Sequence, residues 1–134
     1  MSRRTDQRRD AVFALYQHDL TGRELEDLFE RNASTFTRAL AYAVADYAEE
    51  LDALIARHAK GWTIDRIAPL DKAIMRVALL EIVHPDAAPG EVPIPPEGAI
   101  SEAVELAKEF CGADTPGFVN GILAAVLRER VAGA

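Results

Sequence analysis

The sequence is poor in cysteine: Cys111 is the single one in 134 residues, so an intramolecular disulfide is excluded. Such usage is typical of a reducing compartment. No apolar run reaches the roughly 18 to 20 residues needed to cross a bilayer. The stretch AVFALYQHDL, which follows the first ten residues, is too polar for the core of a signal peptide. These absences predict a soluble cytoplasmic protein that does not enter a membrane.

Recognisable sites for chemistry are also missing from the sequence. The three histidines, His18, His58 and His84, lie far apart and match no metal-binding spacing. The eight glycines are scattered among predicted turns, so they form no phosphate-binding loop. Nothing in the sequence nominates a base that would activate Cys111. We therefore expect no catalytic residue, no metal and no cofactor, and a binding role rather than an enzymatic one.

Positive charge is scarce overall but concentrated at the start of the chain. The formal net charge is -7, yet residues 1–9 hold four arginines against one acid, which leaves the remainder at -10. A run of like charge is commonly a solvated tail. An arginine cluster also attracts phosphates of a polyanion, even when distant surfaces are acidic. Composition leaves both interpretations open for these residues: Arg3, Arg4, Arg8 and Arg9.

Every stretch with a readable hydrophobic period is helical, and no alternation of period two appears. The period predicts a first helix over about 6–20, a short one near 25–29, and a long one over 34–61. Further helices are predicted at 69–84, 97–110 and 115–130, with Ser34 and Thr115 as candidate N-terminal caps. Five of the seven prolines fall within residues 84–98, which predicts an extended loop there.

These patterns predict an all-α bundle of about six to seven helices in one domain, residues 1–134. We expect two packed helical subdomains, an N-terminal one over about 1–60 and a C-terminal one over about 61–134. The proline-rich loop at 84–98 could separate groups of helices, but neither half has enough apolar residues to form a core alone.

Glu81 is unusual for a helical position. It lies on the apolar face and in the last turn, where a negative charge opposes the helix dipole. It could reach solvent at the helix end, pair with a core arginine such as Arg66 or Arg76, or be offered to a partner protein. Gly121 is also unusual, because glycine inside a helix lowers the stability of the helix by about 1 kcal/mol relative to alanine. Either another helix packs closely against Gly121, or the neighbouring Asn120 presents its amide to a ligand.

Asp114 precedes the last predicted helix, and Phe118 follows in its first turn. Asp114 could simply favour the positive end of the helix dipole. Alternatively, a base of single-stranded RNA could stack on Phe118 while Asp114 accepts a hydrogen bond from its edge.

The order of motifs resembles that of the NusB family of transcription antitermination factors. An arginine-rich start runs into RRDAVFALYQHDL, and the blocks DRIAPLDKAIMRVALLEI, AISEAVELAKEF and FVNGILAAVL follow in the family's order over nearly the whole chain. The resemblance implies an all-α, noncatalytic protein. It also implies pairing with the tenth protein of the small ribosomal subunit. That heterodimer would bind the single-stranded boxA element of nascent ribosomal RNA and help the transcription elongation complex to read through terminators.

Carried onto this sequence, the resemblance assigns candidate sites to the positions that match the family's motifs. The basic start of the chain, residues 1–9, would be an RNA-contacting arm. Arg9 in this arm and Tyr16 just after it match the family's RE…LY pattern. Arg76 and Glu81 match its LRxAxxE block, which is associated with docking of the ribosomal protein. The implied RNA-binding residues are Arg3, Arg4, Arg8, Arg9, Tyr16, Asp114, Phe118 and Asn120.

Two alternatives to this function remain open from the sequence. NusB-like domains also recruit RNA for ribosomal RNA cytosine methyltransferases, and a helical bundle could dock proteins without any affinity for RNA. The chain departs from the family in its long HPDAAPGEVPIPPEG link and in Ser101, where the family has asparagine. The sequence also leaves open whether the free protein forms a homodimer.

Overall fold

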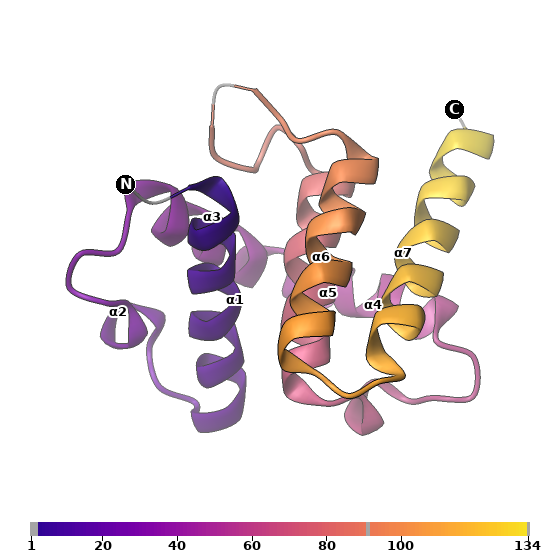
Figure 1. The fold of residues 1–134 in the computed structure, drawn as a ribbon, viewed down its shortest axis with the longest axis horizontal. Helices are drawn as coiled ribbons and strands as arrows, with labels where there is room; N and C mark the ends of the chain where they lie inside the picture. The colour runs from indigo at the N-terminus through magenta and orange to yellow at the C-terminus, as the bar shows by residue number, and fades with distance from the viewer. Residues whose placement is uncertain (1–2, 91, 134) are drawn as a thin grey trace.

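The computed structural model describes residues 3–90 and 92–133, and these form helices and loops without a strand. The all-α prediction is confirmed. In Figure 1, the first three helices occupy one side of the molecule and the last three occupy the other. The helices are α1 (Arg4–Thr21), α2 (Leu25–Leu28), α3 (Thr35–Asp46), α4 (Ala48–His58), α5 (Pro69–Val83), α6 (Pro96–Phe110) and α7 (Thr115–Ala132), with a short 3-10 turn η1 (Ile64–Arg66) before α5.

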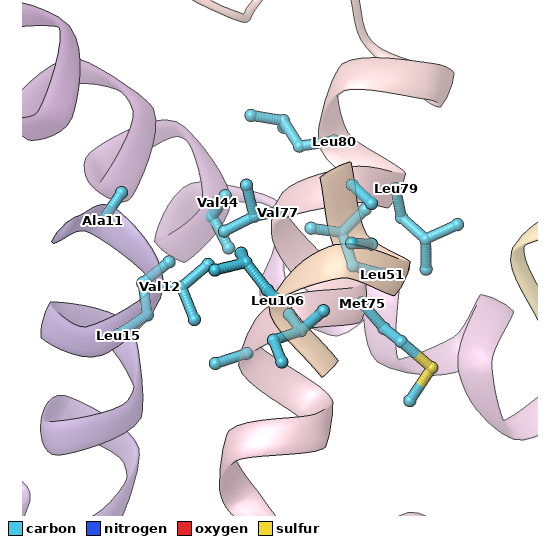
Figure 2. Close-up of a cluster of buried hydrophobic side chains, with 14 of the residues drawn as sticks. Ala11, Val12, Leu15, Val44, Leu51, Met75, Val77, Leu79, Leu80 and Leu106 are labelled. Carbon is cyan, nitrogen blue, oxygen red and sulfur yellow. The ribbon is translucent and has the colours of Figure 1, made fainter. Parts of the chain in front are cut away.

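Helix α5 is the centre of the fold and packs against α1, α3, α4, α6 and α7. It is apolar on nearly all sides, as expected for a helix surrounded by others. Pro69 lies in its first turn, where a missing backbone N–H costs nothing. Figure 2 shows Val12 of α1 close to Val77 of α5 and Leu106 of α6. These contacts join the two sides of the molecule.

The long helix predicted over residues 34–61 is wrong, because the structure breaks it at Tyr47 into α3 and α4. Tyr47 has φ -104° and ψ 13°, and its ring stacks on the His84 ring with centroids 4.1 Å apart. The break lets α3 pack against α1 while α4 packs against α7. The apolar stripe continues through the break, so periodicity alone could not reveal it.

The start of α3 is as predicted: the Ser34 hydroxyl accepts a hydrogen bond from the Thr37 backbone N–H at 3.0 Å. The predicted proline loop also exists, but it is shorter than expected. It ends at Pro95 because Pro96 begins α6, again as a first-turn proline.

One hydrophobic core runs through α1, α3, α4, α5, α6 and α7. The division into subdomains near residue 60 therefore stays a prediction. Among the described residues, no helix is long and apolar enough to cross a membrane.

Candidate nucleic-acid interface

The start of α1 presents two arginines to solvent. Arg3 precedes the helix and Arg4 begins it, and both are exposed. The Arg4 guanidinium lies 4.1 Å from the centroid of the Phe36 ring and donates a hydrogen bond to Gln7 Oε1 at 2.5 Å. Neither arginine forms an ion pair with another residue in the described part of the chain. Their charges are therefore available to an external anion.

Arg9 is partly neutralised within the arm. Its Nη2 lies 3.0 Å from Asp6 Oδ1, one helical turn earlier, and both side chains are at least one-third exposed. An exposed pair of this kind contributes little free energy, typically about 0.2 to 1 kcal/mol. A phosphate could therefore compete with Asp6 for Arg9.

Arg8 points into the protein rather than toward solvent. Its Nε and Nη2 donate to the two carboxylate oxygens of Glu81 at 2.8 and 3.0 Å. Only 11% of the Arg8 side chain and 4% of the Glu81 side chain are exposed. Glu102 of α6 adds a second carboxylate 3.5 Å from Arg8 Nη1. The structure thus joins a predicted RNA-binding residue to a predicted partner-binding residue, and the arginine that pairs with Glu81 is neither Arg66 nor Arg76.

Arg76 is also held inside the fold. Its Nε and Nη2 donate to both oxygens of Asp52 at 2.6 and 2.8 Å, and Asp19 lies 3.7 Å from its Nη1. Burial lowers the pKa of Arg76, but the hydrogen bonds and charges of Asp52 and Asp19 outweigh it, so the net pKa is raised. Arg76 ties α1 and α4 to α5, and its assignment to partner binding stays a prediction.

The second predicted region lies at the start of α7. Asp114 is exposed and precedes the helix without forming a side-chain capping hydrogen bond. Asn120 is exposed, and Phe118 is half-buried. The Phe118 ring meets Trp62 edge-on, with centroids 6.2 Å apart. Asp114 and Phe118 line one groove together with Trp62, whereas Asn120 lies about 200° around α7 from Phe118 and faces away from that groove.

The α6–α7 connection is tied to the first turn of α5 through Asp71. Thr115 is wrong as a predicted cap, because it lies inside α7 and its hydroxyl donates to Asp71 Oδ2 at 3.5 Å. Burial raises the pKa of Cys111 to about 12, and a hydrogen bond with Asp71 adds to the effect. The thiol is therefore protonated and a weak nucleophile near neutral pH.

The two predicted RNA-binding regions lie at opposite ends of α5. Arg8 meets Glu81 in its last turn, whereas Thr115 meets Asp71 in its first. Ten residues of helix separate Asp71 from Glu81, which is about 15 Å along the axis. The structure therefore does not gather the candidate residues into one pocket, and a single RNA strand would have to extend over this distance.

Aromatic residues lie along α1 between these two regions. Phe13 meets Tyr16 edge-on at 6.4 Å and Phe110 of α6 edge-on at 4.9 Å. Phe110 is 41% exposed, while Tyr16 is half-buried. Phe13, Phe110 and Trp62 were not predicted as site residues, because each falls within or beside an ordinary helical pattern. The feature that could have identified them in the sequence is a large aromatic ring at the edge of an apolar helix face.

Gly121 is not explained by close packing, so that interpretation is wrong. A Cβ built at Gly121 would meet nothing within 4 Å, and the residue is exposed on α7. Helix α7 therefore carries a glycine that its folded structure does not require.

We expect Gly121→Ala to stabilise the protein by about 1 kcal/mol, because alanine restricts the unfolded chain and fits the helix. Urea unfolding followed by circular dichroism measures the change. Gly22→Ala is the matched control: Gly22 ends α1 with φ 73°, so the same substitution should destabilise the protein. A loss of stability in Gly121→Ala would contradict the placement of Gly121.

The helical architecture defines the class of protein. The fold is all-α and similar to that of T. maritima NusB, with a TM-score of 0.82 and 26% identity, covering 96% of this chain and 92% of that one. The sequence model of the NusB family matches residues 5–128, and the chain belongs to this family. Transcription antitermination is therefore its function, and the family is not enzymatic.

One further relative supports this placement, and one further solved structure shares the fold. Transcription antitermination protein NusB of Symbiobacterium thermophilum is 41% identical over 145 residues, which cover 96% of this chain and 90% of that protein. A crystal structure of the antitermination factors NusB and NusE in complex with double-stranded RNA contains a chain of the same fold. That chain has a TM-score of 0.78 and is 24% identical, with coverage of 94% of this chain and 96% of its own length.

Proposed function

We propose that this protein pairs with the tenth protein of the small ribosomal subunit and binds a single-stranded boxA element of nascent ribosomal RNA in the cytoplasm. The complex then supports read-through of terminators by the elongation complex. The observation that carries the proposal is the exposure of Arg3 and Arg4, without acidic partners among the described residues, at one end of an otherwise acidic chain. An exposed basic cluster of this kind attracts the phosphates of a polyanion.

The comparisons support the choice of partners. A NusB of the same fold has been solved together with NusE, the ribosomal protein, and with double-stranded RNA. The net charge of -10 outside residues 1–9 suits a basic partner such as a ribosomal protein.

The exposed residues favour a path for the RNA. Phosphates bind Arg3 and Arg4, the strand follows α1 past Phe110, and a base reaches Phe118 at the start of α7. Aromatic side chains of this kind bind bases of single-stranded RNA by stacking, which the regular stack of a duplex does not allow.

Arg8 and Glu81 have an indirect role in this proposal. Because they pair with each other away from solvent, they hold the start of α1 against the end of α5. That packing positions the exposed arginines, and it also shapes the surface around the end of α5 that the ribosomal protein would contact.

The test is fluorescence anisotropy with labelled boxA RNA and a scrambled RNA of the same composition, with and without the ribosomal partner. We expect weak binding by the protein alone, and tighter binding with preference for boxA when the partner is present. Equal affinity for the two RNAs in the presence of the partner would contradict the proposal.

A further inference from the structure

We propose that the connection between α4 and α5 is an additional RNA-binding surface, on which Trp62 stacks against a nucleobase while Lys60 and Arg66 bind the neighbouring phosphates. The inference rests on the proposed function, because it assumes that the ligand is single-stranded RNA. It adds three residues that neither the arginine-rich arm nor the start of α7 contains.

Trp62 is positioned by a tight turn. Gly61 adopts φ +81°, which L side chains rarely allow, and the Trp62 backbone N–H donates to the Ala59 carbonyl at 3.0 Å. The Trp62 ring meets Phe118 edge-on, at 65° between the ring planes, and 52% of the residue remains exposed. The turn thus places a large aromatic surface in contact with solvent, where a base could stack on it.

A groove of about 290 Å³ lies beside this ring. Ile67, Ala68 and Phe118 contribute apolar walls. The polar residues of its lining are Arg66, Asp71, Asp114 and Thr115. Apolar walls favour the face of a planar base, and the polar side chains can bond to its edge or to a phosphate. The groove therefore suits a nucleotide better than a purely apolar ligand.

The groove lining holds the carboxylates of Asp71 and Asp114 as well as Arg66, and a second cation, Lys60, lies nearby in the same connection. Lys60 and Arg66 are exposed, and neither forms an ion pair with any other described residue. In contrast, several basic side chains elsewhere have acidic partners, as in the pairs Arg38–Glu26, Lys72–Asp19 and Lys108–Glu105. Unpaired cations on an acidic protein form a local site for phosphates.

The new surface is continuous with the predicted one at the start of α7, because Trp62 and Phe118 touch. In Figure 1, the chain between α4 and α5 passes close to the N-terminal end of α7. One RNA strand could thus contact Phe118 and Trp62 in succession.

Trp62 is the only tryptophan in the chain, so its fluorescence reports on this surface directly. We expect boxA RNA to quench its emission when added to the protein with a ribosomal partner whose tryptophans have been changed to phenylalanine. In anisotropy measurements, Trp62→Ala should weaken RNA binding about tenfold, as expected for one lost stacking contact. Trp62→Phe should weaken it less, because an aromatic face remains.

The phosphate contacts are tested by changing Lys60 and Arg66 together to alanine. This variant should reduce the magnitude of the log–log salt slope of RNA affinity by about 1.4, which corresponds to two phosphates on a single strand. The matched control changes the exposed Arg23 and Arg31, beside α2 and on the other side of the molecule in Figure 1, and should leave the slope unchanged. Circular dichroism and thermal melting confirm that each variant is folded.

Two results would overturn the inference, and they are distinguishable. If boxA RNA binds in the anisotropy assay but neither quenches Trp62 nor responds to the substitutions, this surface is not used and the proposed function survives. If the wild-type complex binds no RNA, the inference and the proposed function fail together.

Discussion

Arg8→Ala is expected to lower the free energy of unfolding by about 3 kcal/mol, because it leaves the carboxylate of Glu81 without its bidentate partner in a site that is 4% exposed. For a chain of this length, the melting temperature should fall by roughly 10 °C. Chemical denaturation and thermal melting measure both quantities. A folded variant would also lose the anchor between α1 and α5, so its RNA binding and partner binding should weaken together.

A double substitution separates the cost of an unpaired carboxylate from the loss of the ion pair itself. Changing Arg8 to Met and Glu81 to Leu together should recover much of the lost stability, since apolar residues of similar size often replace a buried pair at little cost. Arg9→Ala is the control on the same helix, and we expect a change within about 1 kcal/mol because its pair with Asp6 is exposed. Equal stability losses for Arg8→Ala and Arg9→Ala would contradict the account of Arg8.

Replacing Arg3 and Arg4 together with alanine should have the opposite profile: a large loss of RNA affinity and little change in stability. If each arginine neutralises one phosphate of single-stranded RNA, the affinity at 0.1 M salt should fall about 25-fold. The expected cost to stability is small, about 0.5 to 1 kcal/mol for the exposed contact of Arg4 with Phe36. Fluorescence anisotropy and urea unfolding measure the two effects.

Partner binding provides the specificity control for this variant. We expect the Arg3/Arg4 variant to bind the ribosomal partner as the wild type does, because the Arg8–Glu81 pair that anchors α1 to the end of α5 is unchanged. A variant that loses partner binding while it keeps its RNA affinity would reverse the assignment of the arm.

The helices were largely predictable because their amphipathic periods are strong and their ends carry local signals. Pro69 at the start of α5 and Ser34 at the start of α3 are examples. The break at Tyr47 was not predictable, because it is decided by packing of α4 against α7 and by stacking on His84. Those contacts are distant in sequence and leave the local hydrophobic pattern intact.

The burial of the Arg8 side chain could have been predicted from the sequence. Arg8 precedes Val12 by four residues and Leu15 by seven, so it shares the buried face of α1. Treating residues 1–9 as one block of charge hid this helical position. The identity of its partner was not predictable, since Glu81 lies 73 residues away and their meeting depends on how α1 packs against α5.

Surface exposure was the other quantity that the sequence did not provide. Trp62 and Phe110 looked like boundary residues of helices, yet they are 52% and 41% exposed. Gly121 looked like a packing position, yet it faces open space. In each case the local pattern is compatible with burial or exposure, and the neighbouring helices decide between them.

The salt dependence of RNA affinity, compared between the wild type and the Arg3/Arg4 variant in complex with the ribosomal partner, tests most directly whether the start of α1 binds the phosphates. We expect the slope of log affinity against log salt to be smaller in magnitude by about 1.4 in the variant, the value for two phosphate contacts on a single strand. Identical slopes for the two proteins would show that these arginines do not neutralise RNA phosphates, and would contradict the account.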